Sequence, residues 1–238
     1  MPSEPQLFDA HSESYRDDVE SSIRFARGSL DHFTRLKADH LIRICEAHCG
    51  NPGDLSALDV GCGTGETDRY LVERVGELFG ADVAAKPLDV ARVRNPNANY
   101  VLYDGVSLPF HDSAVDVAFA ICVVHHVPQG RWNAFLTEMS RVTKPGGLVV
   151  IFEHNPLNPL TRHAVSNCEF DEDAVLLRRR ELANLMRTEG LEIVEESFIA
   201  FTPWGSPRVR QLERWVRHLP FGAQHVVAGR VPVIGGQL

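Results

Sequence analysis

The sequence predicts an α/β fold in which a doubly wound, mostly parallel sheet carries helices on both faces and an antiparallel edge strand. Two observations support this prediction. Apolar runs alternate with helical patterns over residues 55 to 155, and a glycine-rich stretch, GCGTG, directly follows the first of those runs. Buried strands that alternate with helices are typical of parallel sheets, in which crossover helices cover both faces.

The elements follow one another in a regular order. Residues 30 to 48 repeat apolar side chains at helical spacing, and Asn51-Pro52-Gly53 ends this helix. Strands are then expected at LSALDVG (55–61), ELFGADV (77–83), NANYVLYD (97–104), AVDVAFAICVV (114–124) and GGLVVIFEH (146–154). Helices are expected between them, at TDRYLVERVG (67–76), PLDVARVR (87–94) and RWNAFLTEMSRVT (131–143). Near the end, LEIVEESFIAF and AQHVVAGRV are predicted to pair as antiparallel strands.

The chain of 238 residues is expected to form a single domain. Its parts are an N-terminal helical cap (1–50), a ligand-binding core (55–155), a lid-like insertion (154–177), and a C-terminal helix with edge strands (178–238). The insertion is rich in proline and asparagine and begins at the carboxyl end of a strand. Long loops in that position are usually lids.

Composition excludes several classes of protein. The net charge of −8 disfavours binding to nucleic acid. The sequence contains no apolar run of about 18 residues, the length that would predict a membrane-spanning helix. The five cysteines form no CxxC pair, which favours a reducing, cytoplasmic location. Cys45 and Cys49 lie one helical turn apart, but no second ligand pair follows them, so no metal site is predicted.

The glycine-rich stretch predicts a ligand site at the carboxyl end of the first strand. Gly61 and Gly63 let the backbone approach a ligand, and the helix expected next would direct its free amides at a phosphate or a carboxylate. The dinucleotide fingerprint needs a third glycine where Glu66 stands, so the register disfavours a pyrophosphate. Asp82 lies 21 residues beyond Gly61, where a carboxylate commonly binds ribose hydroxyls. A tight turn without a ligand is the alternative.

Four motifs in this order resemble those of class I S-adenosylmethionine-dependent methyltransferases that act on small molecules. The motifs are ALDVGCGTG, Asp82, YDGVSLPFHDSAVDVAFAICVVHHVP and EMSRVTKPGGLVVIFEH, and they cover residues 55 to 155. FDAHSESY is similar to the family's lead segment, with Ser12 in place of the usual alanine. The resemblance implies a Rossmann-like sheet of seven strands and S-adenosylmethionine as the cofactor.

The resemblance also implies roles for individual residues. Asp59 and the backbone of Gly61-Cys62-Gly63 would hold the methionine part of the cofactor. Asp82, with Val83 beside it, would bind the ribose hydroxyls. Asp104 and the Gly105 amide would bind the edge of the adenine, Cys122 would lie along the cofactor, and Tyr15 would close over it.

His125 and His126 follow the fourth strand of the core and are candidates for catalysis. Histidine titrates near neutrality, so either could accept a proton from an acceptor hydroxyl. In O-methyltransferases that the chain resembles, a histidine here pairs with a carboxylate after the fifth strand, and Glu153 occupies that place. His154, His163 and Glu169 are further candidates. A structural role for the histidine pair is the alternative.

The acceptor is expected to be a small molecule or a lipid-like compound, with O-methylation favoured because of the two histidines. The segment FTPWGSPRVRQLERWVRHLPFG (201–222) is either an apolar and basic surface for such an acceptor or an amphipathic helix packed on the sheet. Two other functions remain open at this point. One is an NAD(P)-dependent oxidoreductase on a similar sheet, and the other is a non-catalytic protein that binds the cofactor. The sequence predicts no oligomeric state.

Overall fold

The computed structural model of the chain describes residues 30–168, 171, 173–201 and 217–233. Within these residues seven strands form one sheet in the order β3-β2-β1-β4-β5-β7-β6. Neighbouring strands pair in parallel except at β7, which is antiparallel to both β5 and β6. The strands are β1 (Ser56–Val60), β2 (Glu77–Asp82), β3 (Asn99–Leu102), β4 (Val115–Ile121), β5 (Thr143–His154), β6 (Glu192–Ile199) and β7 (Gln224–Arg230). The predicted doubly wound α/β fold is confirmed.

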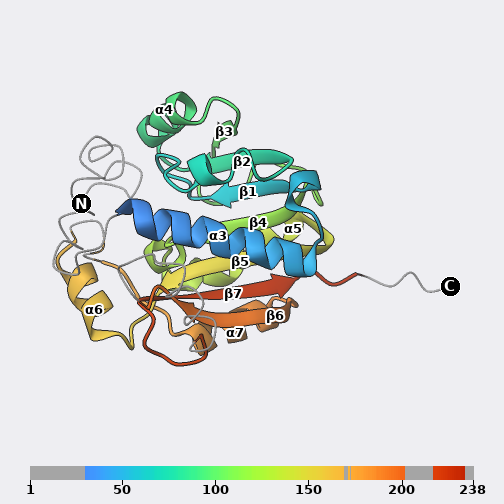
Figure 1. Cartoon of the computed structure of the whole chain (residues 1–238). Helices are drawn as coiled ribbons and strands as arrows, with labels where there is room; N and C mark the ends of the chain where they lie inside the picture. The colour runs from blue at the N-terminus through green and yellow to red at the C-terminus, as the bar shows by residue number, and fades with distance from the viewer. Residues whose placement is uncertain (1–29, 169–170, 172, 202–216, 234–238) are drawn as a thin grey trace.

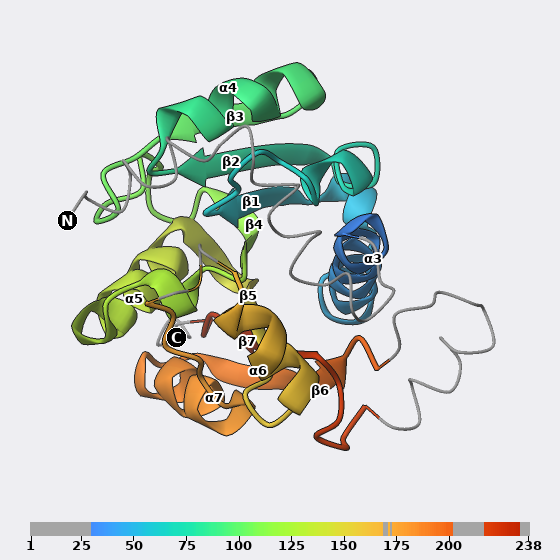
Figure 2. The ribbon, with the colours of Figure 1, turned by 90° about the vertical axis from the view of Figure 1, so that its left-hand side faces the viewer.

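Helices cover both faces of this sheet. Figure 1 shows α3 (Leu30–His48) lying across β1, β4 and β5, and Figure 2 shows α5 (Trp132–Val142) and α7 (Arg179–Thr188) on the opposite face. Helix α4 (Ala85–Arg94) packs near β3, and α6 (Pro159–Ser166) lies at the carboxyl ends of the parallel strands. Short 3-10 turns are formed by Pro52–Asp54, Asp68–Tyr70, Val124–His126 and Gln129–Arg131. No described helix is both long enough and apolar enough to cross a bilayer.

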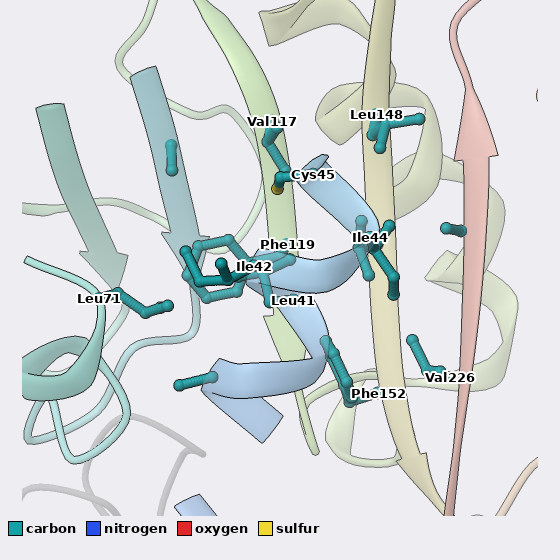
Figure 3. Close-up of a cluster of buried hydrophobic side chains, with 14 of the residues drawn as sticks. Leu41, Ile42, Ile44, Cys45, Leu71, Val117, Phe119, Leu148, Phe152 and Val226 are labelled. Atoms are coloured by element: carbon teal, nitrogen blue, oxygen red, sulfur yellow. The ribbon is translucent and has the colours of Figure 1, made fainter. Parts of the chain in front are cut away.

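Two hydrophobic cores form because the central strands bury both of their faces. Along β4, Phe119 belongs to the core beneath α3, whereas its neighbours Ala118 and Ala120 belong to the core beneath α5 and α7. Successive side chains of a strand point to opposite faces, so a continuous apolar run serves both cores at once. Figure 3 shows Phe119 and Phe152 in the first core, close to Leu41 of α3.

The segment after the glycine-rich stretch is not the helix that the sequence predicts for residues 67–76. Only a 3-10 turn, Asp68–Tyr70, and further turns form there. Its side chains bond to distant elements instead of supporting a helix start: Tyr70 donates to Asp31 at 2.6 Å, and Asp68 accepts from Tyr100 at 2.7 Å. Thr67 at the start makes no capping hydrogen bond. The expected helix dipole behind the glycines is therefore absent from this part of the described chain.

The predicted insertion at residues 154–177 contains a helix, α6, that the sequence interpretation did not include. Asn158 caps it by accepting hydrogen bonds from the amides of Leu160 and Thr161, at 2.9 and 3.2 Å. Pro159 occupies the first turn, where its missing N–H costs nothing. The dipeptide Asn-Pro was therefore a helix start signal. The segment 201–222, interpreted either as an acceptor surface or as an amphipathic helix, lies mostly outside the described residues.

Replacement of Phe119 by alanine tests the first core. The ring is fully buried, so Phe119→Ala should lower the free energy of unfolding by about 3–5 kcal/mol. Val93→Ala is the control, because Val93 is 85% exposed and its loss should change stability by less than about 0.5 kcal/mol. Urea denaturation measures both values. Equal stabilities of the two variants would contradict the assignment of Phe119 to the core.

Candidate active site

One cavity of about 510 Å³ opens at the carboxyl ends of β1, β2 and β4. It collects most of the site residues that the sequence predicts, although they come from loops far apart in the chain. The predicted residues that line it are Asp59, Gly61, Cys62, Gly63, Asp82, Val83, Asp104, Gly105, Cys122, His125 and His126. Glu153 is fully buried behind His125, and Tyr15 lies outside the described residues. Of the further candidates, His154 lines the cavity, His163 is exposed, and Glu169 is outside the described residues.

The glycine-rich stretch forms a tight bend that is tied to the end of β2. Gly61 and Gly63 have φ angles of +80° and +52°, in the left-handed region that favours glycine. The Gly61 amide donates to the carbonyl of Ala81 at 2.7 Å, and the Gly63 amide donates to Asp82 Oδ2 at the same distance. A Cβ atom on Gly63 would meet no other atom within 4 Å. The bend therefore presents open space to the cavity at Gly63.

Asp59 and Asp68 form a buried pair of carboxyl groups beneath this bend. Burial raises the pKa of Asp59 well above its usual range, and the neighbouring Asp68 raises it further. Burial also raises the pKa of Asp68, against the hydrogen bond from Tyr100. Oδ1 of Asp59 receives no hydrogen bond from an amide or hydroxyl of the described residues. This oxygen can therefore accept a donor from a ligand.

Asp82 and Asp104 stand at the ends of the next two strands. Asp82 is buried, and its Oδ1 accepts from the amide of Ala84 at 2.9 Å, so it braces the bend as well as lining the cavity. Asp104 is exposed and accepts from the amides of Val106 and Ser107, both at 2.8 Å. These amides hold the pKa of Asp104 below its usual range. Both groups are therefore anchored carboxylates at the cavity wall.

Cys122 carries backbone strain at the end of β4. Its φ angle is +58°, in the left-handed region that non-glycine residues seldom adopt. The amide of Cys122 donates to the carbonyl of Phe152 at 2.8 Å, and the side chain of Gln224 donates to its sulfur at 3.2 Å. These contacts hold the strained turn, which directs the chain from the sheet into the 3-10 turn Val124–His126.

A cluster of histidines and carboxylates forms the other end of the cavity. His125 Nδ1 lies 2.5 Å from Glu153 Oε2, and its Nε2 lies 3.3 Å from Asp171 Oδ1. His126 Nε2 is 3.4 Å from the same Asp171 oxygen. The ring of His154 lies 5.2 Å from that of His125, measured between ring centroids.

The pKa values in this cluster are strongly shifted. Burial alone would lower the pKa of His125, but Glu153 and Asp171 outweigh it and raise the pKa well above its usual value. Burial and the neighbouring His125 lower the pKa of His126 to about 4. Burial would raise the pKa of Glu153, but His125 lowers it to about 2. In this arrangement His125 carries the proton and Glu153 is ionised.

Comparison with known proteins identifies the core. Residues 58–151 match the family described as a methyltransferase domain. This segment is thus similar to methyltransferases, and solved structures of similar fold include S-adenosylmethionine-dependent enzymes. These comparisons do not favour the nicotinamide alternative.

Similar proteins act on different kinds of acceptor atom. Over 132 residues the chain is 36% identical to a malonyl-[acyl-carrier protein] O-methyltransferase of Serratia marcescens. The matched residues make up 56% of this chain and 51% of that protein. The chain thus spans about half the length of this relative. A Thermotoga maritima methyltransferase, described as a possible histamine N-methyltransferase, has a similar fold, with a TM-score of 0.67 at 20% identity over 96% of this chain and all of the other.

A third similar structure is a geranyl diphosphate C-methyltransferase from Streptomyces coelicolor, in complex with Mg²⁺, geranyl diphosphate and S-adenosyl-L-homocysteine. It has a TM-score of 0.58 at 17% identity and covers 81% of this chain and 78% of the other. The three proteins methylate, by their names, oxygen, nitrogen and carbon. The fold is therefore shared across acceptor chemistries and does not by itself select one.

The cavity has room and an acceptor for the amino-acid end of S-adenosylmethionine, the cofactor that the sequence resemblance implies. Asp59 Oδ1 receives no hydrogen bond from an amide or hydroxyl of the described residues, and an ammonium group would supply one. The open space at Gly63 lies on the same cavity wall. The residues present therefore fit the group that the family requires.

The structure adds Lys37, which the sequence interpretation missed. Lys37 is only 7% exposed, comes from α3 and lines the cavity. Burial and Asp68 raise the pKa of Asp59, and the positive charge of Lys37 opposes this rise. The same charge lowers the pKa of His154. A signal was present in the sequence, because Lys37 lies four residues from both Phe33 and Leu41 on the apolar face of the helix. A lysine within such a face needs a partner or a ligand.

Replacement of Gly63 by alanine separates a ligand cradle from a simple turn. An alanine at φ +52° should cost about 1–2 kcal/mol of stability, but it meets no protein atom and leaves the fold intact. The added methyl group enters the space proposed for the cofactor, so the affinity for S-adenosylhomocysteine should fall about tenfold or more in calorimetry.

Gly50→Ala is the matched control for this test. Gly50 has φ +99° and open surroundings, but it lies after α3 and does not line the cavity. It should lose similar stability and keep the affinity of the unmodified chain. The same affinity in both variants would show that the bend does not hold the cofactor.

Proposed function

We propose that this chain transfers the methyl group of S-adenosylmethionine to an oxygen atom of a small or lipid-like acceptor. The observation that supports this most is the single cavity, which joins the glycine bend and its carboxylates to the histidine cluster. When bound, the cofactor supplies an electrophilic methyl group on its sulfonium sulfur. The chain contributes mainly by holding the acceptor in line with that group, since orientation can be worth about 7–11 kcal/mol.

The residues at the bend form the cofactor half of the cavity in this proposal. Asp59 and the backbone of residues 61–63 hold the methionine end, where Lys37 is close enough to attract a carboxylate. Asp82 binds the ribose hydroxyls through charge-assisted hydrogen bonds, with Val83 beside it. The assignment of Asp82 is compatible with its two hydrogen bonds to backbone amides, because a carboxylate has about four acceptor positions.

The remaining contacts to the cofactor concern the adenine and the lid. Asp104 and the amide of Gly105 bind the adenine edge, and Cys122 lies along the cofactor. The carbonyl of Gly105 accepts from Arg131 at 3.2 Å, which supports this loop. Tyr15 is proposed to close over the cofactor, and the insertion at 154–177 to close over the acceptor, as a lid would.

His125, His126 and Glu153 form the catalytic group at the acceptor end. Glu153 holds His125 through Nδ1 and is itself held by the amide of Val124 at 2.8 Å. The two imidazoles then offer polar contacts to an acceptor hydroxyl or carboxyl group. Apolar side chains surround them and suit a largely apolar acceptor; they include Leu30, Phe33, Val127, Phe135 and Val165.

Oxygen is preferred over nitrogen and carbon on two grounds. Imidazoles fixed by a carboxylate are suited to bind a hydroxyl group, and the relative from Serratia marcescens is named as an O-methyltransferase. A cytoplasmic location is proposed with it, because all five cysteines are free thiols.

Calorimetry with S-adenosylhomocysteine tests the cofactor half. The unmodified chain should bind this product and should not bind NADH. Asp82→Asn should weaken the binding by about 1–3 kcal/mol, because a charge-assisted bond becomes a neutral one. Asp89→Asn is the control, since the Asp89 side chain is 76% exposed on α4. An unchanged affinity of Asp82→Asn would refute the ribose assignment.

Methyl transfer itself is tested with a panel of phenols, alcohols, carboxylic acids and amines, with S-adenosylhomocysteine formation as the readout. Turnover should appear with an oxygen nucleophile and should fall when His125 is replaced by alanine, while the cofactor affinity stays unchanged. Turnover with amines alone would overturn the preference for oxygen. Cofactor binding without turnover of any acceptor would favour the non-catalytic binding protein.

A further inference from the structure

We propose that His125, His154 and Asp171 bind a divalent transition-metal ion at the acceptor end of the cavity. The three residues come from separate parts of the chain: the turn after β4, the end of β5, and the segment after α6. All three line the same cavity. The spacing of the cysteines predicts no metal site, and these three ligands share no spacing that a sequence pattern would show.

The donor atoms lie close together, and one of the distances between them is that expected around a small metal ion. One nitrogen of each histidine and one oxygen of Asp171 all lie within 4.8 Å of one another. His125 Nε2 and Asp171 Oδ1 are 3.3 Å apart. Two ligands of a tetrahedral zinc ion, with bonds of about 2.0–2.1 Å, lie about 3.3 Å from each other. His126 Nε2 lies 3.4 Å from the same oxygen, so it is near enough to serve as a further ligand.

Glu153 orients His125 in the way that metal sites require. Its Oε2 lies 2.5 Å from Nδ1 of His125, while its Oε1 accepts from the Val124 amide. With Nδ1 bonded to Glu153, Nε2 is the nitrogen that faces Asp171 and the cavity, and a metal ion would bind there by displacing the Nε2 proton. Histidine ligands of metals usually carry such a carboxylate on the other ring nitrogen, where it fixes the tautomer and the ring orientation.

His154 supplies a second, independent observation. Neither of its ring nitrogens is hydrogen-bonded to another residue within the described part of the chain. It nevertheless lies beside His125, with 5.2 Å between ring centroids, and faces the cavity. His154 is only partly buried, so a ring nitrogen can take a partner from the cavity. A metal ion between His154, His125 and Asp171 would be that partner.

The ligand set also selects the class of ion. Two imidazole nitrogens and one carboxylate oxygen suit Zn²⁺, Fe²⁺, Co²⁺ or Ni²⁺, whereas Mg²⁺ and Ca²⁺ prefer oxygen ligands alone. Three protein ligands leave a coordination position for a further group. If the proposed function holds, an acceptor oxygen would take that position, and the ion would favour its deprotonated form. Metal binding itself does not depend on the proposed function.

Metal titration of the full chain tests the site. After treatment with a chelator, each chain should bind one Zn²⁺ or one Co²⁺ ion in calorimetry and should not bind Mg²⁺. The double variant His154→Gln/Asp171→Asn should lower the affinity by at least about tenfold, and Glu153→Gln by about 10- to 100-fold. The control is His111→Gln, at an exposed histidine outside the cavity, and it should leave the metal affinity unchanged.

The absorption of bound Co²⁺ distinguishes this site from the five thiols. Nitrogen and oxygen ligands give weak visible bands, whereas a thiolate ligand adds an intense band in the near ultraviolet. A thiolate band, equal affinity of the double variant and the unmodified chain, or no binding of Zn²⁺ would each overturn the proposal and leave His125 as a histidine held between two carboxylates.

S-adenosylhomocysteine binding, measured on the same samples, separates this result from the proposed function. Loss of the metal site should leave the cofactor affinity unchanged, because the ligands lie at the other end of the cavity. A chain that binds metal but not S-adenosylhomocysteine would refute the proposed function and keep the metal site.

Discussion

The pairing of β1 with β4 is the constraint on which the site depends. β1 pairs with β2 on one side and with β4 on the other, and all three strands are parallel. The chain leaves β1 toward β2 and β3, and only later returns to β4. The loops after β1 and β4 therefore diverge, and a crevice opens between their carboxyl ends. The cavity lies in this crevice, so the ladder at the centre of the sheet determines where both halves of the site can be.

Burial couples the two halves of the site to the core. Asp59 is the last polar side chain of β1, and Glu153 lies near the end of β5, so each carboxyl group sits where an apolar strand meets the cavity. Charged groups are costly in such positions unless they have partners. Glu153 has such a partner in His125, whereas Asp68 beside Asp59 raises the pKa of Asp59 and favours its neutral form. Burial destabilises the charged forms, and the groups packed around these carboxyls orient them. Together they shift the pKa values, as is usual at functional sites.

The two ends of the cavity differ in chemistry, and Lys37 lies within reach of both. The bend carries carboxyl groups and backbone amides, which suit a ligand with an ammonium group and a sugar diol. The far end carries imidazoles that converge on one carboxylate, Asp171, which suits an oxygen nucleophile or a metal ion. The charge of Lys37 acts on Asp59 at one end and on His154 at the other. Such separation lets one cavity hold two different ligands side by side.

The sequence by itself determined the succession of strands along the chain and the positions of the bend and of Asp82, because these depend on local hydrophobic period and on short spacings. Only the tertiary structure decided the rest. Asp68 turns away from a helix start because Tyr100, 32 residues later, donates to it. Asp171 joins His125 across 46 residues, and Lys37 enters the cavity because α3 packs over the sheet. Contacts between distant segments follow from packing and leave no local pattern from which they could be predicted.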